Sequence, residues 1–333
     1  MNSFGRLFRV SVFGESHGSS VGILIDGCPA GLPISPPDFE PDLKRRQPGS
    51  VGTTARREKD AIRFESGILG RRTNGAPLLI RFENRDVRPA DYASYGETPR
   101  PGHADFVAQK KYGGFADLRG GGHFSGRLTV GLVAAGVIAK KLIAPATVQA
   151  TLVSVGGSKD IQMAVRAAQE VGDSLGGIIE ARARRLPVGL GEPFFDSVES
   201  VLSHLIFAIP GVKGIEFGAG FKAADMTGSS YNDAMVDTLG RTKTNHSGGI
   251  NGGITNGNDL MFKIAVRPAA SISREQKTVN LRTQKPEVIV IRGRHDACIA
   301  LRMPVIVEAV TAIALADLLL LEQRIPRAAG KRP

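Results

Sequence analysis

Two segments of the chain are apolar at almost every position over the length of a long helix. The first covers about residues 125–143, with Ser125 as a suitable N-cap, and the second covers about residues 304–322. A helix that is apolar on all sides must be covered on all sides. The pattern therefore predicts two helices enclosed within the protein.

Short stretches rich in β-branched residues, each bounded by Gly or Pro, predict strands. They lie at residues 7–12, 22–25, 77–82, 148–155, 178–183, 214–217 and 288–291. Further helices are predicted at residues 35–46, 160–171 and 196–207, the first with a capping-box-like start at Ser35. Because the long helices need cover from both sides, we expect an α+β fold: a β-α-β sandwich with the long helices between two antiparallel sheets.

The order of short motifs indicates a degenerate internal duplication. Residues 172–179, 187–190 and 255–257 repeat the character of residues 18–25, 29–32 and 73–75. Chance similarity of glycine-rich segments is the alternative explanation. We expect one domain over residues 1–333, built from pseudo-repeats at about residues 1–145 and 146–325.

The formal net charge of +11 and the pI near 9.9 indicate an anionic partner, which could be nucleic acid, an acidic membrane or a multiply charged small substrate. The chain has no Trp, only 6% aromatic residues and no run of basic residues longer than three, which disfavours nucleic acid. Arginines within two residues of a Gly or Pro instead suit forked contacts to carboxylates or phosphates in a pocket. They are Arg46, Arg100, Arg119, Arg127, Arg241, Arg267 and Arg294.

Several classes of protein are disfavoured. No uninterrupted apolar run of membrane-spanning length is evident and the N-terminus lacks a signal-peptide pattern, so we expect a soluble, cytoplasmic protein with no membrane partner. Cys28 and Cys298 are too far apart for a Cys-x-x-Cys metal site and too few for a disulfide framework. No two histidines are three to five residues apart, so no metal site is expected.

Five of the six histidines lie in glycine-punctuated polar segments, where loops concentrate binding and catalytic groups. Only His204 sits in a helix-like apolar stretch. The segment 14–18, Gly-Glu-Ser-His-Gly, also fits the nucleophile elbow of a hydrolase. An elbow must run into a helix, whereas residues 19–26 alternate like a strand, so a serine hydrolase is disfavoured.

Five motifs, in this order and spacing, closely resemble the chorismate synthase family. They are Gly-Glu-Ser-His-Gly at 14–18, Arg-Pro-Gly-His-Ala-Asp at 100–105, Gly-Gly-Gly-His-Phe-Ser-Gly-Arg at 120–127, Asn-His-Ser-Gly-Gly-Ile at 245–250 and Gly-Arg-His-Asp-Ala-Cys at 293–298. The resemblance covers the chain from about Phe4 to Leu321. It implies a β-α-β sandwich that assembles as a homotetramer.

The resemblance also implies a carbon-oxygen lyase of the shikimate pathway, which leads to the aromatic amino acids. Its reaction is the 1,4-trans elimination of phosphate and a C6 hydrogen from 5-enolpyruvylshikimate 3-phosphate, which gives chorismate. Reduced FMN is required although there is no net redox change. Whether the chain reduces its own flavin with NADPH stays open.

Catalytic roles follow from the resemblance, position by position. His17 is similar to the general acid that protonates the departing phosphate, and Ser16 to a residue that orients substrate or flavin. His103 would govern protonation at the reduced flavin ring, and Asp296 would help the flavin N5 accept the C6 proton. Ser125 matches a serine near the flavin.

Binding roles follow in the same way. The flavin positions implied are His123, Phe124, Ser125, Pro210, Gly211, Gly252, Arg267, Pro268, Ala269, Ala270, Ser271 and Arg294. The substrate-anion ligands implied are Arg46, Arg100 and Arg127. His295 is expected to buttress its neighbours, and His246 has no assigned role.

The chain departs from the family pattern at three places. Residues 49–52 form a segment one residue short and without its usual basic residue, so either Arg56 or Arg57 substitutes or the substrate phosphate is held less tightly. Ala297 stands where the family usually has proline, and Ala269 and Ala270 replace hydroxyl-bearing residues. Two alternatives therefore accompany the main interpretation: a catalytically impaired relative that binds flavin or a phosphometabolite, and a basic nucleic-acid-binding protein.

Overall fold

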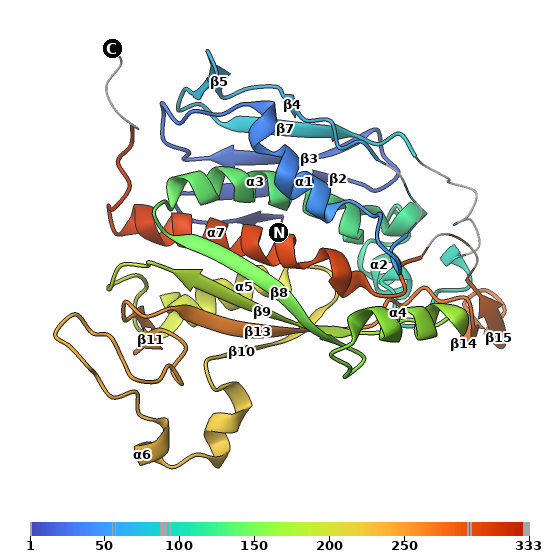
Figure 1. Cartoon of the computed structure of the whole chain (residues 1–333). Coiled ribbons are helices and arrows are strands. Elements are labelled where there is room, and N and C mark those ends of the chain that lie inside the picture. Colours follow the sequence, from blue (N-terminus) through green and yellow to red (C-terminus); the bar gives the residue numbers. More distant parts are fainter. Residues whose placement is uncertain are drawn as a thin grey trace.

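The structure is a computed structural model that describes residues 2–54, 56, 58–86, 92, 95–291, 293 and 295–328. Two antiparallel sheets form its outer layers, and the long helices lie between them (Figure 1). This arrangement confirms the α+β sandwich predicted from the apolar helices.

The first sheet has the strand order β1-β2-β3-β7-β4, and every pairing in it is antiparallel. Its central strand alternates between the core and the outer face, with Ile23 and Ile25 fully buried and Leu24 exposed. The strands are β1 (Ser3–Phe4), β2 (Arg9–Gly14), β3 (Ser20–Asp26), β7 (Leu78–Glu83) and β4 (Arg63–Phe64).

The second sheet has the strand order β10-β13-β9-β8 and is also antiparallel. Strand β13 buries every second residue, from Leu260 to Val266, against the helices. The strands are β10 (Val212–Phe217), β13 (Leu260–Val266), β9 (Gly177–Arg184) and β8 (Thr147–Val155).

The two sheets share one connectivity, because β2-β3-β7-β4 has the same chain order as β8-β9-β13-β10. Two buried threonines, one in each half of the chain, also make matching local hydrogen bonds. Thr73 Oγ1 donates to the Pro29 carbonyl at 2.6 Å and accepts the Leu32 amide at 2.9 Å. Thr255 Oγ1 makes the same two bonds, with the carbonyl and amide three residues apart at 187 and 190, at 2.8 and 2.9 Å. We propose on this basis that the chain is one domain made of two pseudo-repeats.

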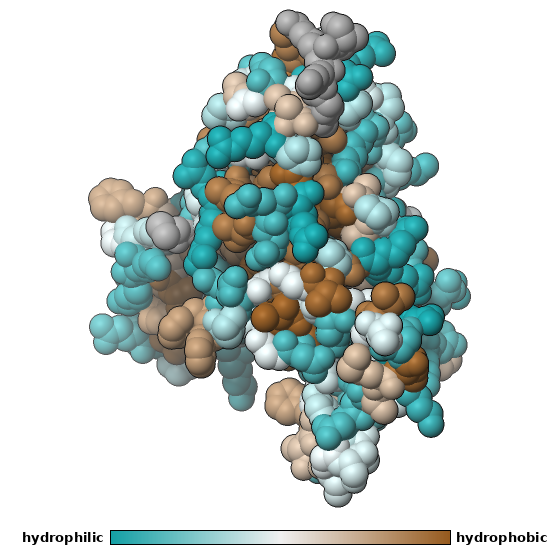
Figure 2. Space-filling model, turned by 90° about the vertical axis from the view of Figure 1, so that its left-hand side faces the viewer, coloured by the Kyte–Doolittle hydropathy of each residue, from teal (hydrophilic) through white to brown (hydrophobic). Residues whose placement is uncertain are grey.

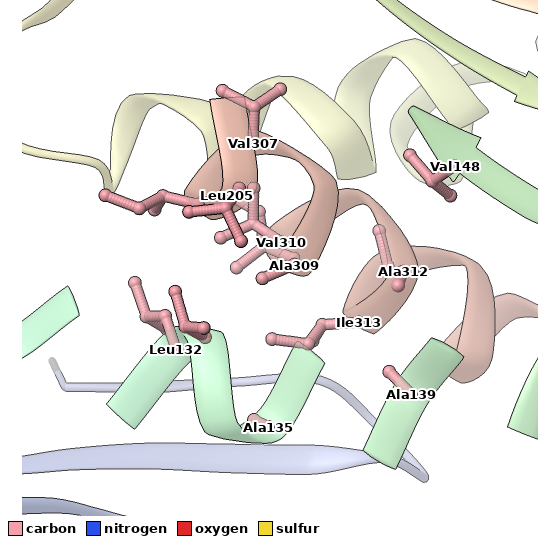
Figure 3. Close-up of a cluster of buried hydrophobic side chains, with 14 of the residues drawn as sticks. Leu132, Ala135, Ala139, Val148, Leu205, Val307, Ala309, Val310, Ala312 and Ile313 are labelled. Atoms are coloured by element: carbon pink, nitrogen blue, oxygen red, sulfur yellow. The ribbon is translucent and has the colours of Figure 1, made fainter. Parts of the chain in front are cut away.

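Four helices fill the space between the sheets: α1 (Glu40–Arg46), α3 (Thr129–Leu142), α5 (Val198–Phe207) and α7 (Pro304–Leu321). Helix α3 packs on β3 of the first sheet, α7 packs on β8 of the second, and the two helices pack on each other. Figure 3 shows buried side chains between the two helices, among them Leu132 and Ala139 of α3 and Ala309 and Ile313 of α7. Gly136 lies against Ala309, and these small residues let the backbones approach closely.

Smaller elements were predicted less well. Helix α4 (Ile161–Glu170) and the capping box at Ser35 agree with the prediction. The strand predicted at 288–291 is β15 (Lys285–Val290), and its partner β14 (Glu275–Asn280) was missed, as were α6 (Gly228–Tyr231) and two short hairpins. Helix α2 (Asp105–Lys111) directly follows His103 and Ala104. The hairpins pair β5 (Ile68–Leu69) with β6 (Arg72–Thr73) and β11 (Ile250–Asn251) with β12 (Ile254–Thr255).

Helix α7 is long and apolar enough to cross a membrane by length and composition alone, a property that the sequence reading overlooked. Of that window, 89% is buried inside the protein, so its apolar side chains serve the core. The face in Figure 2 accordingly mixes hydrophilic residues with separate groups of hydrophobic ones.

The contact between α3 and α7 yields a first prediction. A Cβ added at Gly136 would lie 2.3 Å from Ala309 Cβ and 2.5 Å from Ala309 Cα, so the helices would have to separate. We expect Gly136→Ala to lower the free energy of unfolding by about 1–3 kcal/mol, measured by urea denaturation. In Gly228→Ala, the matched control, the new Cβ meets nothing within 4 Å. Equal midpoints for the two variants would contradict the packing argument.

Candidate functional site

A cavity of about 320 Å³ opens where α3 and α7 begin, on the right-hand side of Figure 1. Its walls come from both pseudo-repeats: the turn after β2, the segment after α1, the approach to α3, the segment after β13 and the approach to α7. The volume suits a small-molecule ligand. Among the described residues, six arginines and four carboxylates line it, namely Arg46, Arg56, Arg100, Arg127, Arg267 and Arg302 with Glu58, Asp60, Asp86 and Asp296.

The turn between β2 and β3 carries Ser16 and His17 into the cavity. Strand, turn and strand follow one another here, so the hydrolase elbow is excluded by the structure as it was by the sequence. Ser16 is fully buried, and its Oγ accepts a hydrogen bond from Arg56 Nη1 at 3.0 Å. The His17 ring meets Tyr92 edge-on at 5.0 Å between centroids.

Three glycines, residues 120–122, allow the chain to approach this turn. All three have positive φ, which disfavours other residues. A Cβ at Gly120 would lie 2.3 Å from ring atoms of His17 and 2.8 Å from Ser16 Oγ. The Gly122 carbonyl accepts the Ser16 amide at 3.0 Å. Gly120 therefore lines the cavity directly against His17.

His103 belongs to a second cluster, in which Asp105 is the shared acceptor. Arg100 Nε and Nη2 donate to the two carboxylate oxygens of Asp105 at 2.7 and 2.8 Å, and His103 Nδ1 lies 2.7 Å from Asp105 Oδ1. Burial disfavours the carboxylate, yet its bonds with Arg100 and His103 outweigh burial and hold the pKa of Asp105 far below its ordinary value. Asp105 is therefore an ionised acceptor at neutral pH.

Asp60 joins two further arginines of the cavity. Its carboxylate pairs with Arg46 Nη2 at 2.5 Å and with Arg127 Nη1, and all three side chains are almost completely buried. Burial disfavours the carboxylate, but Arg46 and Arg127 outweigh it and hold the pKa of Asp60 below its ordinary value. Burial also lowers the pKa of Arg46. The negative charge of Asp60 opposes this shift, and the positive charge of Arg127 adds to it. One carboxylate thus serves two buried guanidinium groups, which leaves positive charge for a ligand.

Asp296 is fixed from two sides at the start of α7. Arg302 Nη2 donates to Asp296 Oδ2 at 2.6 Å, and the Thr54 amide donates to Oδ1 at 2.8 Å. The short segment before Thr54 also docks here, because the Ala297 amide donates to the Gly52 carbonyl at 2.8 Å.

Comparison with known proteins identifies the family. The profile described as chorismate synthase matches residues 8–320. A chorismate synthase from Chitinophaga pinensis is 59% identical over 325 residues, which cover 97% of this chain and 98% of that protein. One from Dehalococcoides mccartyi is 45% identical, with 98% of each chain covered.

The chain belongs to the chorismate synthase family. A solved structure described as a crystal structure of chorismate synthase superposes with a TM-score of 0.75 at 25% sequence identity, covering 96% of this chain and 93% of that one. Chorismate synthases are carbon-oxygen lyases of aromatic biosynthesis that use reduced flavin, so the family supports the main interpretation over its two alternatives.

Most positions taken from the chorismate synthase motifs do meet in the cavity. The structure places there all five residues predicted as catalytic and all three predicted as substrate ligands. Of the flavin positions, Phe124, Ser125, Pro210, Gly211, Arg267, Ala269, Ala270 and Ser271 line it, and His295 joins them.

Three flavin positions lie elsewhere. His123 packs on Phe124 and Tyr112, with ring centroids 4.1 and 5.5 Å away, because the preceding glycines turn Phe124 instead toward the cavity. Pro268 does not line the cavity, although residues on both sides of it do. Gly252 lies in the tight turn between β11 and β12, away from the cavity lining. Arg294 and Arg57 lie outside the described residues.

Sequence reasoning missed Asp60, Asp105 and Arg302. Asp105 stands inside the quoted motif at 100–105, two residues from His103, and that proximity was a usable signal. Asp60 and Arg302 become meaningful only through tertiary partners. His246, which had no assigned role, lies in a loop with Nδ1 3.0 Å from the Tyr231 carbonyl.

The buried Arg46–Asp60–Arg127 cluster yields a pH-dependent prediction. Because the pKa of Asp60 is lowered in the folded state, its contribution to stability is present above its unfolded pKa, roughly 4, and is lost as the pH falls through the acid range. We expect Asp60→Asn to lower the free energy of unfolding at neutral pH by about 3 kcal/mol, with a difference from wild type that shrinks on acidification.

Urea denaturation at a series of pH values measures this difference. Asp196→Asn, which removes the partner of Arg6 in an exposed ion pair, is the control and should change stability little at any pH. A loss of stability in Asp60→Asn that stayed constant down to acid pH would contradict the linkage.

Proposed function

We propose that the chain converts 5-enolpyruvylshikimate 3-phosphate to chorismate and phosphate in this cavity, with reduced FMN bound beside the substrate. The observation that carries the proposal is the placement of both histidines, His17 and His103, in one cavity with an excess of arginines over carboxylates. A substrate with two carboxylates and a phosphate needs such an excess.

The arginines are prepared for anions. Among the described residues, Nε of Arg46, Arg56 and Arg302 is buried and has no hydrogen-bond acceptor. A buried guanidinium N–H without an acceptor costs free energy, which a ligand oxygen would recover. The cavity also opens at the starts of α3 and α7, where helix dipoles favour negative charge. We assign Arg46, Arg100 and Arg127 to the substrate anions.

Arg56 takes the place of the missing basic residue in this proposal. It is the described member of the pair 56 and 57, and it reaches the cavity, where it donates to Ser16 Oγ at 3.0 Å and pairs with Glu58 at 2.9 Å. Its buried Nε remains available for a phosphate oxygen.

Another part of the cavity lining suits a flat ring system. Pro210, Gly211, Ala269 and Ala270 offer small side chains, and Phe124 an aromatic one. Ser271 Oγ, 3.4 Å from Arg100 Nη1, adds a polar contact. These residues would hold FMN, which when bound in its reduced form supplies transient electron density to the elimination.

The proton transfers fall to the chain's own side chains. His17 would donate a proton to the phosphate as its bond to C3 breaks, and Ser16 would orient the substrate beside it. His103 would hold or release a proton at the ring nitrogen that faces the cavity. Asp296, fixed by Thr54 and Arg302, would place negative charge beside the proton that leaves C6. Ser125 would bind next to the flavin.

We also propose that the protein is a cytoplasmic homotetramer. Three phenylalanines support assembly, because Phe194, Phe195 and Phe221 are 87%, 93% and 85% exposed. Gly252 does not line the cavity of its own subunit, so the turn that carries it would be free to contact another subunit. Mass photometry measures the assembly, and a monomer at micromolar concentration would contradict it.

Turnover under anaerobic conditions tests the function. With 5-enolpyruvylshikimate 3-phosphate and reduced FMN, the chain should release phosphate and chorismate, and His17→Ala should lose at least about a hundredfold in kcat with an unchanged melting temperature. Tight FMN binding without phosphate release would favour the impaired relative. The same assay with oxidised FMN and NADPH in place of reduced FMN shows whether the chain reduces its own flavin, because turnover then requires that step.

Gly120 provides a test of geometry at constant chemistry. Gly120→Ala introduces a Cβ 2.3 Å from the His17 ring at a backbone φ of 59°, so His17 must move. We expect kcat to fall at least about tenfold. Gly70→Ala is the matched control, since it has a similar φ of 55° with nothing within 4 Å. Equal kcat values for the two variants would mean that the position of His17 does not matter for the reaction.

A further inference from the structure

Asp105 has no role in the proposed chemistry, yet its buried carboxylate is hydrogen-bonded to two residues that line the cavity, Arg100 and His103. It is 1% exposed and begins α2. Its two oxygens accept from the amide, Nε and Nη2 of Arg100 at 3.1, 2.7 and 2.8 Å, and they also face His103 Nδ1 at 2.7 Å.

We propose that Asp105 is a positioning residue that holds the proton of neutral His103 on Nδ1 and so presents an unprotonated Nε2 to the cavity. The inference rests on the proposed function for its catalytic meaning. The tautomer itself is a property of the folded chain.

The assignment follows from which atoms can donate. An ionised carboxylate only accepts hydrogen bonds, and a guanidinium only donates them. His103 Nδ1 lies 2.7 Å from Asp105 Oδ1 and 3.0 Å from Arg100 Nη2. Arg100 Nη2 has two hydrogens and donates one of them to Asp105 Oδ1. The contact between Nδ1 and the ionised Oδ1 is the shorter of the two that Nδ1 makes, and it is a hydrogen bond only if Nδ1 carries the proton, so the carboxylate decides the tautomer. A proton on Nδ1 satisfies Asp105, whereas a bare Nδ1 would set a lone pair against its negative charge.

The other ring nitrogen lies on the side of Gly121 and Ser125. A Cβ at Gly121 would lie 3.6 Å from both Nε2 and Cε1 of His103 and 3.7 Å from Ser125 Cβ. His103 and Ser125 both line the cavity, so Nε2 lies close to its lining. Because Nε2 carries the lone pair, His103 can accept a proton at Nε2 and later return it from the same atom. The tautomer therefore decides which ring nitrogen takes part in proton transfer.

Arg100 benefits from the same carboxylate. Its guanidinium is held in a forked pair with Asp105 and lies 4.5 Å from the centroid of Tyr95. The buried Asp105 side chain therefore fixes both Arg100, a proposed substrate ligand, and His103, a proposed proton-transfer group. The two effects separate in kinetics, since loss of the fork should raise KM and loss of the tautomer should lower kcat.

Spectroscopy tests the tautomer without turnover. In long-range ¹H–¹⁵N spectra of the full chain labelled at histidine, with His103 assigned through His103→Gln, neutral His103 should show its proton on Nδ1. In Asp105→Asn a substantial share of the proton should move to Nε2. A wild-type ring protonated on Nε2 would overturn the proposal, as would a ring unchanged by the substitution.

Kinetics tests the consequence. Asp105→Asn should lower kcat roughly tenfold or more. In the His103→Gln background the same substitution should leave kcat almost unchanged, because a residue that acts through His103 has nothing left to position. Asp196→Asn is again the exposed control. An equal loss of kcat in both backgrounds would make Asp105 a structural residue only. If the wild-type chain released no phosphate, the proposed function would fail while the spectrum still decided the tautomer.

Discussion

Helices α3 and α7 touch where Gly136 faces Ala309, without room for a methyl group between them. Each helix is covered on its other side by the sheet of its own half of the chain. Because both helices begin at the same end, the segments that precede them meet there. Ser125 and Arg127 enter from one, and Asp296 and Arg302 from the other. The packing of the core thus assembles the cavity from two halves that are distant in sequence.

At the cavity, a few carboxylates each form ion pairs with one or two arginines. Asp60 holds Arg46 and Arg127, Asp105 holds Arg100, and Asp296 takes one donor of Arg302. Each carboxylate occupies part of a guanidinium and leaves other N–H groups directed elsewhere. The arginines are therefore oriented before any ligand arrives, and the free-energy cost of burying them is shared with the fold.

The core was predictable because helices apolar on every side can lie only inside the protein. The cavity residues were largely predictable because their motifs are short and contiguous. The direction of the His123 ring was not, since three positive-φ glycines before it decide which neighbouring side chain faces inward. Strand β14 was missed because its alternating residues are only half-buried and mostly polar. Asp60 escaped notice because its partners lie 14 and 67 residues away.

Ala297 and the segment 49–52 are coupled through the backbone. The segment ends with the Gly52 carbonyl bound to the Ala297 amide, and a proline at 297 would have no amide hydrogen to donate. Gly52 also presses against Val165 at a positive φ. Any residue except proline at position 297 can donate this hydrogen bond. The docked segment near residue 50 therefore restricts which residue can stand at a position far away in the sequence.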